Sequence, residues 1–401
     1  MNNIFGENLK QHCCGCRACE QACPQNCIQI KQDNEGFLLP FCMDENTCIE
    51  CAACVRVCPT LDRAIGHKAE LAYGLIHKNT DITNNSASGG AFSALASYVI
   101  DRGGTVFGCI MDKDLNVLTA EARNWEDLKA MQSSKYVQCD TNIQYTRIQE
   151  RLYKCEWVLY CATPCQIAGL KKYLNNEYDT LILVDLFCHG VPAQGLFAKY
   201  LEYLGKAKKH PVEKLVFRDG QREWGTTGYY IAGNKFEYLD TDPFYYSFLA
   251  GNTYASICYH CPYANRERVG DISIGDFWGV QELYPEVDIS RGVSAVLVNT
   301  TKGKQVFESI EDKVICFKST VEHVSLYNTV LIEPTKLYEK RDELYRHFQK
   351  MPMEEFVKLY LAPNISITQR IKLRTYSFLV KLRLNFVINS YRKLKARKPR
   401  A

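Results

Sequence analysis

The sequence predicts an α/β protein, α+β overall, with a cysteine-rich head (residues 1–66), an α/β body with a mixed sheet (67–350) and a basic helical tail (351–401). Three observations lead to this fold class. Eleven of the 20 cysteines fall in the first 58 residues. After His67, strand and helix patterns alternate along the chain, which is typical of α/β folds. From Phe356 onward there are twelve Lys or Arg and no Asp or Glu.

Length and composition limit the function classes. The 401 residues are enough for two or three domains, and 46% hydrophobic with 23% charged residues excludes a disordered chain or a fibre. No apolar stretch approaches the ~18–20 residues that span a bilayer, and Met1 to Gln11 lacks the regions of a signal peptide. We therefore expect a cytoplasmic protein, in which 20 cysteines indicate metal or redox chemistry rather than disulfides.

The head contains one cysteine pattern twice, 35 residues apart, in which three cysteines separated by two residues are followed by Cys-Pro. This is the spacing of bacterial two-[4Fe–4S] ferredoxins, in which three close thiolates bind one cluster and the fourth cysteine reaches the other cluster. One cluster is assigned to Cys13, Cys16, Cys19 and Cys58, and the other to Cys48, Cys51, Cys54 and Cys23. The alternative, a pair of zinc sites, leaves the third cysteine and the trailing Cys-Pro unexplained.

The other elements follow from local patterns. In the head, apolar residues on either side of the polar turn Asp33–Gly36 predict a short hairpin. In the body, strands are predicted over 71–76, 105–111, 157–160 and 180–187, and helices over 91–102 and 164–174. Gly103-Gly104 ends the first helix, and Thr163-Pro164 begins the second with an N-cap and a first-turn proline.

Two classes of nucleotide site are excluded by glycine spacing. No two glycines are separated by one residue, so G-x-G-x-x-G is absent, and the Walker motif is absent as well. A Rossmann NAD site and a P-loop ATPase are thus unsupported, whereas a non-Rossmann flavin site stays open. Residues before Phe356 carry 37 basic and 45 acidic groups, a net charge of −8, so no nucleic-acid partner is expected.

Four cysteines of the body occupy positions that are typical of reactive or metal-binding residues. Cys165 is expected in the first turn of the 164–174 helix, where the helix dipole favours a thiolate. Cys188 follows a buried-looking strand at its carboxyl end, where open α/β sheets bind their ligands. Cys258 and Cys261 form a Cys-x2-Cys-Pro pair. Spacing alone leaves open whether the four meet at one metal site or are single buried cysteines.

Five stretches follow the head in a set order. They are Ser88-Gly89-Gly90, Ser134-Lys135-Tyr136, Thr163-Pro164-Cys165-Gln166, Cys188-His189-Gly190-Val191-Pro192 and CYHCPYANRERVGDISIGDFWG at 258–279. With the head, they resemble the coenzyme F420 (deazaflavin) hydrogenase/dehydrogenase β-subunit family over roughly residues 1–300. The resemblance implies an FAD-binding α/β domain with its own [4Fe–4S] cluster. Its pattern maps this third cluster onto Cys165, Cys188, Cys258 and Cys261.

FAD-binding residues are expected near these motifs. They are Ser86, Ser88, Gly89, Gly90, Lys135, Tyr136, Thr163 and Gln166. Small residues before a helix N-terminus allow a pyrophosphate to approach free N–H groups, although an ordinary capped helix start explains the 86–90 segment equally. Lys135 and Tyr136 would supply charge and stacking to the same cofactor, and the alternatives are a solvated lysine and a core tyrosine.

Three residues are predicted to act on the substrate. His189 is the expected proton donor, because the ordinary pKa of histidine lies near neutrality, and a structural histidine is the alternative. Arg218 and Asp219, with Trp224, follow a predicted strand and would bind a polar substrate; a surface ion pair is the alternative. Asp276 is interpreted as holding a turn.

These features predict an iron–sulfur flavoprotein oxidoreductase. Electrons are expected to pass from ferredoxin, or a similar one-electron donor, through the [4Fe–4S] clusters to FAD and on to an organic substrate. That substrate would be a small molecule or a lipid-linked precursor, because bacterial members of the family are often associated with surface-polysaccharide loci. The alternatives are a deazaflavin-linked subunit of a larger complex and an electron-transfer module without its own substrate.

The tail carries a helical pattern. Between Ile367 and Leu394, apolar residues recur mostly three, four or seven apart, with Lys and Arg among them. An amphipathic basic helix is typical of attachment to a membrane surface, here the inner face, or of docking to an acidic partner. Packing on the protein's own acidic body is the alternative.

Overall fold

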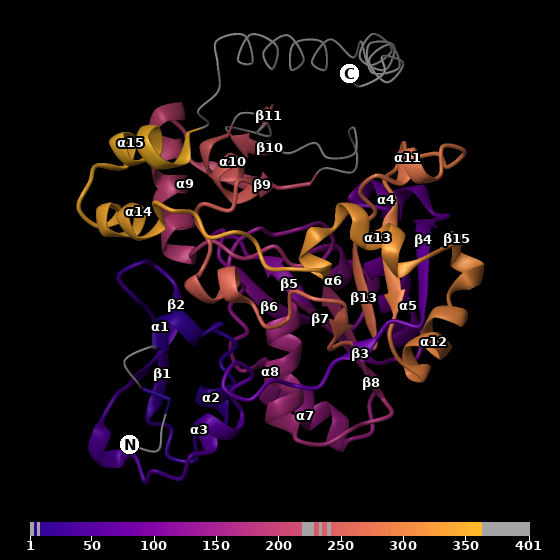
Figure 1. Ribbon diagram of the computed structural model, residues 1–401, viewed down its shortest axis with the longest axis horizontal. Helices are drawn as coiled ribbons and strands as arrows, with labels where there is room; N and C mark the ends of the chain where they lie inside the picture. The colour runs from indigo at the N-terminus through magenta and orange to yellow at the C-terminus, as the bar shows by residue number, and fades with distance from the viewer. Residues whose placement is uncertain (1–3, 6–8, 219–227, 232–234, 239–241, 363–401) are drawn as a thin grey trace.

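The structure, a computed structural model, describes residues 4–5, 9–218, 228–231, 235–238 and 242–362. Figure 1 shows three neighbouring parts within these ranges: the head, a large sheet with its helices, and a helical group above the head. The predicted α/β fold class with a mixed sheet is confirmed. The predicted tail helix falls in 363–401, outside the described residues.

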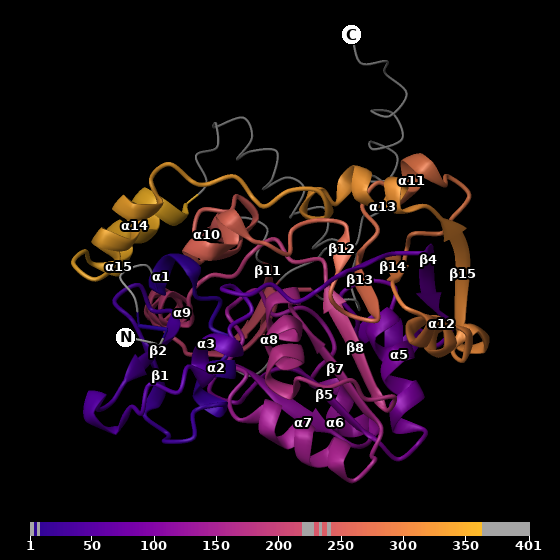
Figure 2. The ribbon, with the colours of Figure 1, turned by 60° about the horizontal axis from the view of Figure 1, so that its bottom comes forward.

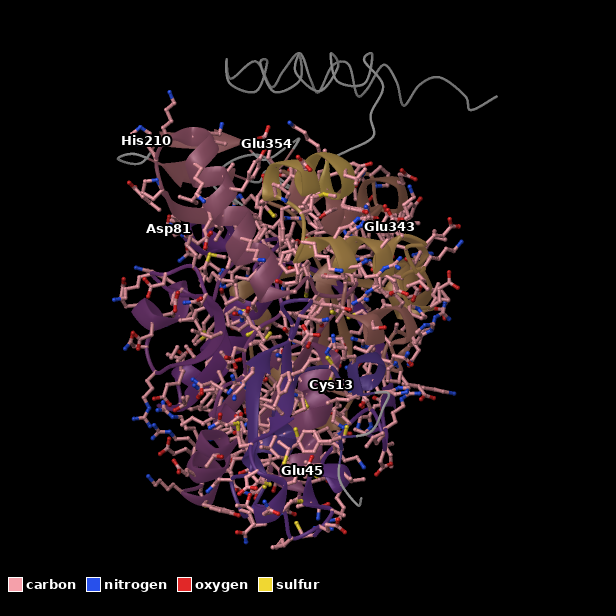
Figure 3. All side chains as sticks on the ribbon, turned by 90° about the vertical axis from the view of Figure 1, so that its left-hand side faces the viewer. Cys13, Glu45, Asp81, His210, Glu343 and Glu354 are labelled. Carbon is pink, nitrogen blue, oxygen red and sulfur yellow. The ribbon has the colours of Figure 1, made fainter. Side chains whose placement is uncertain are left out.

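The head is a hairpin with short helices. β1 (Ile28–Gln32) pairs antiparallel with β2 (Leu38–Cys42), as predicted. Asp33 Oδ1 accepts hydrogen bonds from the N–H groups of Glu35 and Phe37 and thereby fixes the turn. The helical elements are α1 (Leu9–His12), α2 (Ala18–Gln21), η1 (Glu45–Thr47) and α3 (Ala53–Arg56). Figure 3 shows Glu45 at the end of the molecule away from Glu354, with Cys13 between them.

An eight-stranded mixed sheet forms the centre of the body. Its strands, in spatial order, are β15 (Val314–Ser319), β4 (Leu71–His77), β14 (Ser294–Val298), β13 (Ile272–Asp276), β8 (Leu181–Leu186), β7 (Val158–Ala162), β5 (Thr105–Met111) and β6 (Val117–Ala122). The four neighbours β13, β8, β7 and β5 run parallel, and the outer pairs are antiparallel. The carboxyl ends of four strands therefore meet at one edge of the sheet.

Helices cover both faces of the sheet. One face carries α5 (Ala91–Ile100), α6 (Trp125–Lys129) and α12 (Thr301–Glu308), and the other carries α7 (Gln144–Tyr153), α8 (Pro164–Leu174) and α13 (Val321–Tyr327). Figure 2 shows α7 and α8 side by side. Along β7, Leu159 packs toward α5, whereas Val158 and Tyr160 pack toward α7 and α8. Burial on both faces explains why this strand is a continuous apolar run.

A third group of elements packs beside the head. It comprises α9 (Gln194–Lys208), α10 (Pro243–Leu249), α14 (Arg341–Phe348), α15 (Met353–Phe356), a π-helical turn (Val357–Leu361) and the small sheet of β9 (Val212–Val216), β10 (Gly228–Ile231) and β11 (Lys235–Tyr238). Phe356, Tyr360 and Leu361 are buried in the same cluster as Phe197 of α9. The chain thus packs against the body up to Leu361, beyond the predicted boundary at residue 350.

Short elements complete the described structure. They are β3 (His67–Lys68), which pairs with β12 (Glu267–Arg268), α4 (Thr80–Asn85), α11 (Val280–Leu283) and the 3-10 turns Ser256–His260, Glu311–Lys313 and Thr329–Leu331. A search of the described ranges finds no helix with the length and apolar character needed to cross a membrane.

Candidate functional site

A cavity of about 560 Å³ opens at the carboxyl edge of the parallel strands. Its wall includes Cys109 of β5, Cys161 of β7, His189 after β8 and Asp276 of β13. Pockets for small molecules and cofactors have volumes of ~300–1,000 Å³, so this cavity falls in that class. Its position is the one at which open α/β sheets bind ligands.

All four predicted body cysteines line this cavity. Cys165 lies in the first turn of α8, where Thr163 and Gln166 form a capping box around Pro164. The Oγ1 atom of Thr163 is 3.3 Å from the Sγ atom of Cys165. Hydrogen bonds from the side chains of Cys14 and then Thr163 outweigh burial and lower the pKa of Cys165 to about 7. A distant residue, Cys14, and the local N-cap residue Thr163 together favour the thiolate form of Cys165.

The other three cysteines converge on Cys165. The charges of Cys165 and Cys261 act on Cys188, and those of Cys188 and Cys261 act on Cys258. Burial raises the pKa of Cys188 to about 12 and that of Cys261 to about 11, and it raises the pKa of Cys258 well above its usual value. Neighbouring buried thiols with raised pKa values lose their protons when a metal centre binds them. The four cysteines thus line one cavity and influence one another's pKa values.

A buried ion pair holds the segments that carry these cysteines. Arg268 and Asp185 are almost fully buried, and Arg268 Nη2 lies 2.6 Å from Asp185 Oδ1. Arg268 also donates to the backbone oxygens of Leu186, Tyr263 and Asn265. The pair therefore fixes the end of β8, just before Cys188, against the segment after Cys261. Sequence reasoning missed both residues, although a lone aspartate in an apolar strand is a signal for a buried partner.

The head brings cysteines of its two repeats close together, and the crossed cluster assignment stays a prediction. Burial raises the pKa of Cys19 well above its usual value, and the neighbouring Cys13, Cys16, Cys58 and Cys54 add to this, so cysteines of both repeats lie near Cys19. In the second set, one small pocket of about 20 Å³ is lined from both repeats. Its cysteines are Cys23, Cys27, Cys48, Cys51 and Cys54. The pocket thus contains the four predicted ligands and Cys27, which the sequence did not assign.

The two cysteine loops share one backbone conformation. Arg17 and Ala52, 35 residues apart, have φ values of 61° and 58°, and Gly15 and Glu50 have 68° and 50°. Left-handed residues in such loops form backbone nests that bind anions, and a thiolate-ligated cluster is an anion. Among the described residues, no group of three or more His, Cys, Asp or Glu is arranged to hold a single metal ion.

The first head set faces the body. A Cβ atom on Gly169 of α8 would lie 2.9 Å from Cys16 Sγ, so glycine permits this close approach. Thr141 Oγ1 donates to the backbone oxygen of Cys16 at 2.9 Å. In the second set, by contrast, Cys51 is exposed. The two sets are therefore an inner and an outer group relative to the cavity.

Three of the four residues predicted in the 86–90 segment to bind the FAD pyrophosphate line the cavity. Ser86, Ser88 and Gly90 line it, and the hydroxyls of both serines already donate to backbone carbonyls. Gly90 has a φ of +88° and is the N-cap of α5. Gly89 is not part of the wall, and a Cβ atom there would lie 2.0 Å from the carbonyl oxygen of Leu75. Close packing on β4 is thus the observed reason for glycine at position 89.

Four further predicted cofactor residues line the cavity: Lys135, Tyr136, Thr163 and Gln166. Lys135 Nζ donates to three backbone oxygens of its own turn, and burial lowers its pKa to about 8. The ring of Tyr136 stacks on that of Phe248, with 4.3 Å between centroids. Gln166 Nε2 donates to the backbone oxygen of Cys139, and Thr163 caps α8. These polar groups therefore have protein partners, and Tyr136 adds an aromatic surface to the wall.

Arg218 is a buried cation in the cavity wall, as Arg268 is. Its side chain is 4% exposed, and Nη2 donates to Asp276 Oδ1 at 3.2 Å and to the backbone oxygen of Ala87 at 3.1 Å. Among the described residues, no group hydrogen-bonds its buried Nε. The guanidinium carbon lies 5.4 Å from the ring centre of Trp278. Arg218 is therefore not a surface ion pair, and Asp276 is its partner at the cavity.

Of the remaining residues predicted to act on the substrate, the structure describes only His189. His189 lines the cavity and is exposed, so it lies at the mouth. Its backbone oxygen accepts a hydrogen bond from Thr335 at 2.8 Å. Asp219 and Trp224 lie outside the described residues. Sequence reasoning did not anticipate Phe248, which reaches the wall from α10 and shows no motif.

Two known protein-family models match the chain, one over the head cysteines and one over the body cysteines. Residues 155–323 match the family model for the C-terminal part of the coenzyme F420 hydrogenase/dehydrogenase beta subunit, and this range contains all four body cysteines. Residues 12–61 match the family model of the 4Fe-4S dicluster domain, and this range contains the eight head cysteines assigned as cluster ligands. The resemblance inferred from the motifs is thereby confirmed. Segments 86–90 and 135–136 lie outside both matched ranges.

Solved structures include a similar chain in the xenon-derivatised F420-reducing [NiFe] hydrogenase complex from Methanosarcina barkeri. It is 16% identical, the alignment covers 74% of this chain and 91% of that chain, and the TM-score is 0.44. No curated protein sequence matches the chain significantly.

Proposed function

We propose that this chain, whose residues 155–323 match the family model for the C-terminal part of the coenzyme F420 hydrogenase/dehydrogenase beta subunit, is an iron–sulfur flavoenzyme that accepts single electrons at its head and reduces an organic substrate in the body cavity. The observation that carries the proposal is the succession of cysteine groups. The outer head set is partly exposed, the inner head set contacts α8, and the body set lines the cavity. This order leads from the protein surface to a ligand-sized space.

The body cysteines suit an iron–sulfur cluster. Cys165, Cys188, Cys258 and Cys261 supply four soft sulfur ligands, the set that iron–sulfur clusters require. Arg268 lies behind them, and its charge lowers the pKa values of Cys188 and Cys261 against the larger effect of burial. In this proposal Arg268 and Asp185 keep the ligand segments in place before a cluster is bound.

The cavity also suits an anionic flavin nucleotide. Gly90 places a left-handed turn without a side chain at the N-terminus of α5, where backbone N–H groups favour a phosphate. Arg218 adds a buried guanidinium whose Nε has no partner among the described residues. When bound, a flavin supplies the conversion between one-electron and two-electron chemistry.

The residues around this space would position the substrate. Tyr136, Tyr245 and Phe248 pack together and line the cavity, and in this proposal their rings would shield the substrate from water. His189 at the mouth would deliver the proton that accompanies reduction. Arg218, held by Asp276, would orient a polar group of the substrate.

The proposal also names an electron donor and a substrate class. Ferredoxin, or a similar redox protein, is the proposed donor because the outer cysteine set is accessible at Cys51. A sugar-derived or lipid-linked precursor of a surface polysaccharide is the proposed substrate class, and the family setting is its only support. Aromatic side chains in the wall are compatible with a ring-shaped substrate.

Metal and flavin analysis of anaerobically purified protein tests the cofactor assignment. We expect about twelve irons, about twelve labile sulfides and about one FAD per chain, from three cubane clusters. Cys165→Ala and Cys188→Ala should each lose about four irons and retain the head clusters. Cys316→Ala on β15, away from the cavity wall, is the matched control and should keep all iron. Full iron retention in both cavity variants would reject the third cluster.

Turnover by the isolated chain separates the proposal from its alternatives. With reduced ferredoxin and candidate substrates, a flavoenzyme with its own substrate should show steady-state substrate reduction. A deazaflavin-linked subunit should instead reduce or oxidise F420 and require partner subunits. An electron-transfer module should exchange electrons with ferredoxin without consuming any small molecule.

A further inference from the structure

We propose that Asp140 of the body is a positioning residue for the inner head cluster and sets its reduction potential, because it holds Arg17 in the inner cysteine loop and offsets the charge of that arginine. The inference deepens the proposed function and rests on it through this one cluster, which the match to the 4Fe-4S dicluster domain also supports. Neither residue belongs to a ligand set.

Arg17 lies within the inner cysteine loop, between Cys16 and Cys19, and its backbone is left-handed with a φ of 61°. Its side chain is 13% exposed and reaches the body. Arg17 Nη2 donates to Asp140 Oδ2 at 2.8 Å, and Arg17 Nε lies 2.6 Å from Asp140 Oδ1. A guanidinium that contacts both oxygens of one carboxylate is fixed in direction and in rotation. The pair therefore fastens the loop to a residue of the body.

The neighbours of Asp140 hold the head at two further points. Thr141 Oγ1 donates to the backbone oxygen of Cys16 at 2.9 Å. Gln138, which is 4% exposed, accepts from the N–H of Leu38 at 2.8 Å and donates to the backbone oxygen of the same residue at 3.2 Å. Side chains from one short segment, 138–141, thus fix both the inner cysteine loop and the head hairpin.

The same segment also contacts the start of α8. Gln166 Nε2 donates to the backbone oxygen of Cys139 at 2.9 Å, and Gln166 directly follows Cys165. The backbone oxygen of Gln166 accepts from the hydroxyl of Tyr145 at 2.7 Å, which holds this turn from the side of α7. Segment 138–141 therefore lies between the loop that carries Cys16 and the turn that carries Cys165.

The charges around the loop determine the expected effect. Arg17 Nη1 also donates to Glu20 Oε2 at 3.0 Å, so one cation and two carboxylates form a group with a net charge of −1. The side chains of Arg17, Glu20 and Asp140 are 13%, 21% and 23% exposed, so water screens their charges only in part. A cluster becomes more negative when it is reduced, so nearby negative charge lowers its potential and nearby positive charge raises it.

Redox titration of the full chain, followed by electron paramagnetic resonance, tests the inference. Asp140→Asn keeps the shape of the side chain, changes the net charge of the group from −1 to 0 and should make one head-cluster potential more positive. Arg17→Gln changes the charge to −2 and should make the same potential more negative. The double variant restores −1 and should return toward the wild-type potential, and Asp140→Glu, which keeps the charge, should stay near it. Iron content should be unchanged in all four variants.

Two control variants carry the same change of charge elsewhere. Glu308 is exposed on α12, which covers the face of the sheet opposite α8, so Glu308→Gln should leave every potential unchanged (Figure 1). Glu50 precedes the exposed Cys51 and lines the outer pocket of the head. Glu50→Gln should therefore raise the other head-cluster potential, which assigns the two signals to the inner and outer sets.

Shifts of the same sign in Asp140→Asn and Arg17→Gln would overturn the inference, because they would indicate a general disturbance of the loop. Unchanged potentials in both variants would also overturn it. If Asp140→Asn alone loses iron, the double variant must still have a more positive potential than Arg17→Gln. Failure of the proposed function is distinguishable, because it appears in the wild type as absence of flavin, of a third cluster or of turnover, while the head-cluster potentials remain measurable.

Discussion

Asp242 is the N-cap of α10, the helix that brings Tyr245 and Phe248 to the cavity. Its carboxylate accepts hydrogen bonds from the N–H of Tyr245 at 2.9 Å and from the hydroxyl of Tyr200. Burial nevertheless dominates and raises the pKa of Asp242 to about 6. A carboxyl group that is easier to protonate when folded binds more protons in the native state than in the unfolded state. Stability from this residue is therefore present at low pH and is lost as pH rises through about 6.

Asp242→Asn removes this cost and retains the cap. Asparagine is as good an N-cap as aspartate: its Oδ1 can accept from the N–H of Tyr245, and its Nδ2 can donate to the hydroxyl of Tyr200. We expect the variant to be more stable than the wild type by about 1–3 kcal/mol at pH 7.5. The difference should shrink toward zero near pH 4, as measured by urea unfolding at both pH values. An equal difference at both would contradict a titrating Asp242.

In the turn before α5, Gly89 and Gly90 are each needed as glycine for a different reason. Gly90 gives the left-handed N-cap at the cavity, whereas Gly89 allows the turn to pack on the sheet. A Cβ atom at position 89 would approach the Leu75 oxygen of β4 to 2.0 Å and the Ser294 nitrogen of β14 to 2.7 Å. Both atoms belong to backbone, which cannot move aside as a side chain can.

Gly89→Ala should therefore destabilise the fold before it affects any cofactor. We expect a loss of about 1–3 kcal/mol or more in the free energy of unfolding, because the sheet must shift. Gly205→Ala in α9 is the matched control, since its Cβ would meet nothing closer than 3.4 Å and alanine favours a helix. It should be neutral or stabilising by up to about 1 kcal/mol. Wild-type stability of Gly89→Ala with lowered FAD binding would instead favour a direct cofactor role.

At the scale of the whole molecule, the C-terminal part of the described chain completes the core. Phe356, Tyr360 and Leu361 pack in the cluster that also contains Phe37 and Leu39 of the head. Arg341 of α14 adds an ion pair, 2.6 Å in length, to Glu35 in the turn of the head hairpin. The last described elements thus hold head and body together.

Two truncated chains should separate the core from the tail. A chain ending at Ala362 keeps Phe356 and Leu361 and should retain the iron, flavin and melting temperature of the full chain. A chain ending at Lys350 loses these buried side chains, each worth about 2–5 kcal/mol, and should unfold or aggregate. Melting curves and iron analysis of both chains measure the difference. Equal stability of the two would show that the 351–362 segment is dispensable.

The same chains test the tail. Eleven basic residues and no acidic ones follow Ala362, and several basic groups near an anionic leaflet contribute about 1 kcal/mol each. We expect the full chain, but not the chain ending at Ala362, to sediment with anionic vesicles at low salt and to be released at high salt. Absence of sedimentation by the full chain at low salt would favour docking to a protein surface.

Several local features followed from sequence because their causes are local. The 164–174 helix has the predicted bounds, since Thr163, Pro164 and Gln166 determine its start within one turn. The head hairpin also follows from a local pattern, a polar turn between two apolar stretches. The ends of strands followed less closely from sequence. Trp157 is a residue type common in strands and was predicted to begin one, but β7 begins at the next residue, Val158.

The sequence by itself determined which residue types are present and how the short motifs fold: the repeated cysteine loops, the capped helix at Cys165 and the alternation that builds a mixed sheet. Only the tertiary structure decided which of these motifs meet. It buried Arg268 against Asp185, packed Gly89 on the sheet instead of in the cavity wall, and placed Cys14 of the head in the same cavity wall as Cys165. The physical reason is distance along the chain. Contacts between residues tens to hundreds of positions apart depend on the packing of whole elements, which no local spacing encodes.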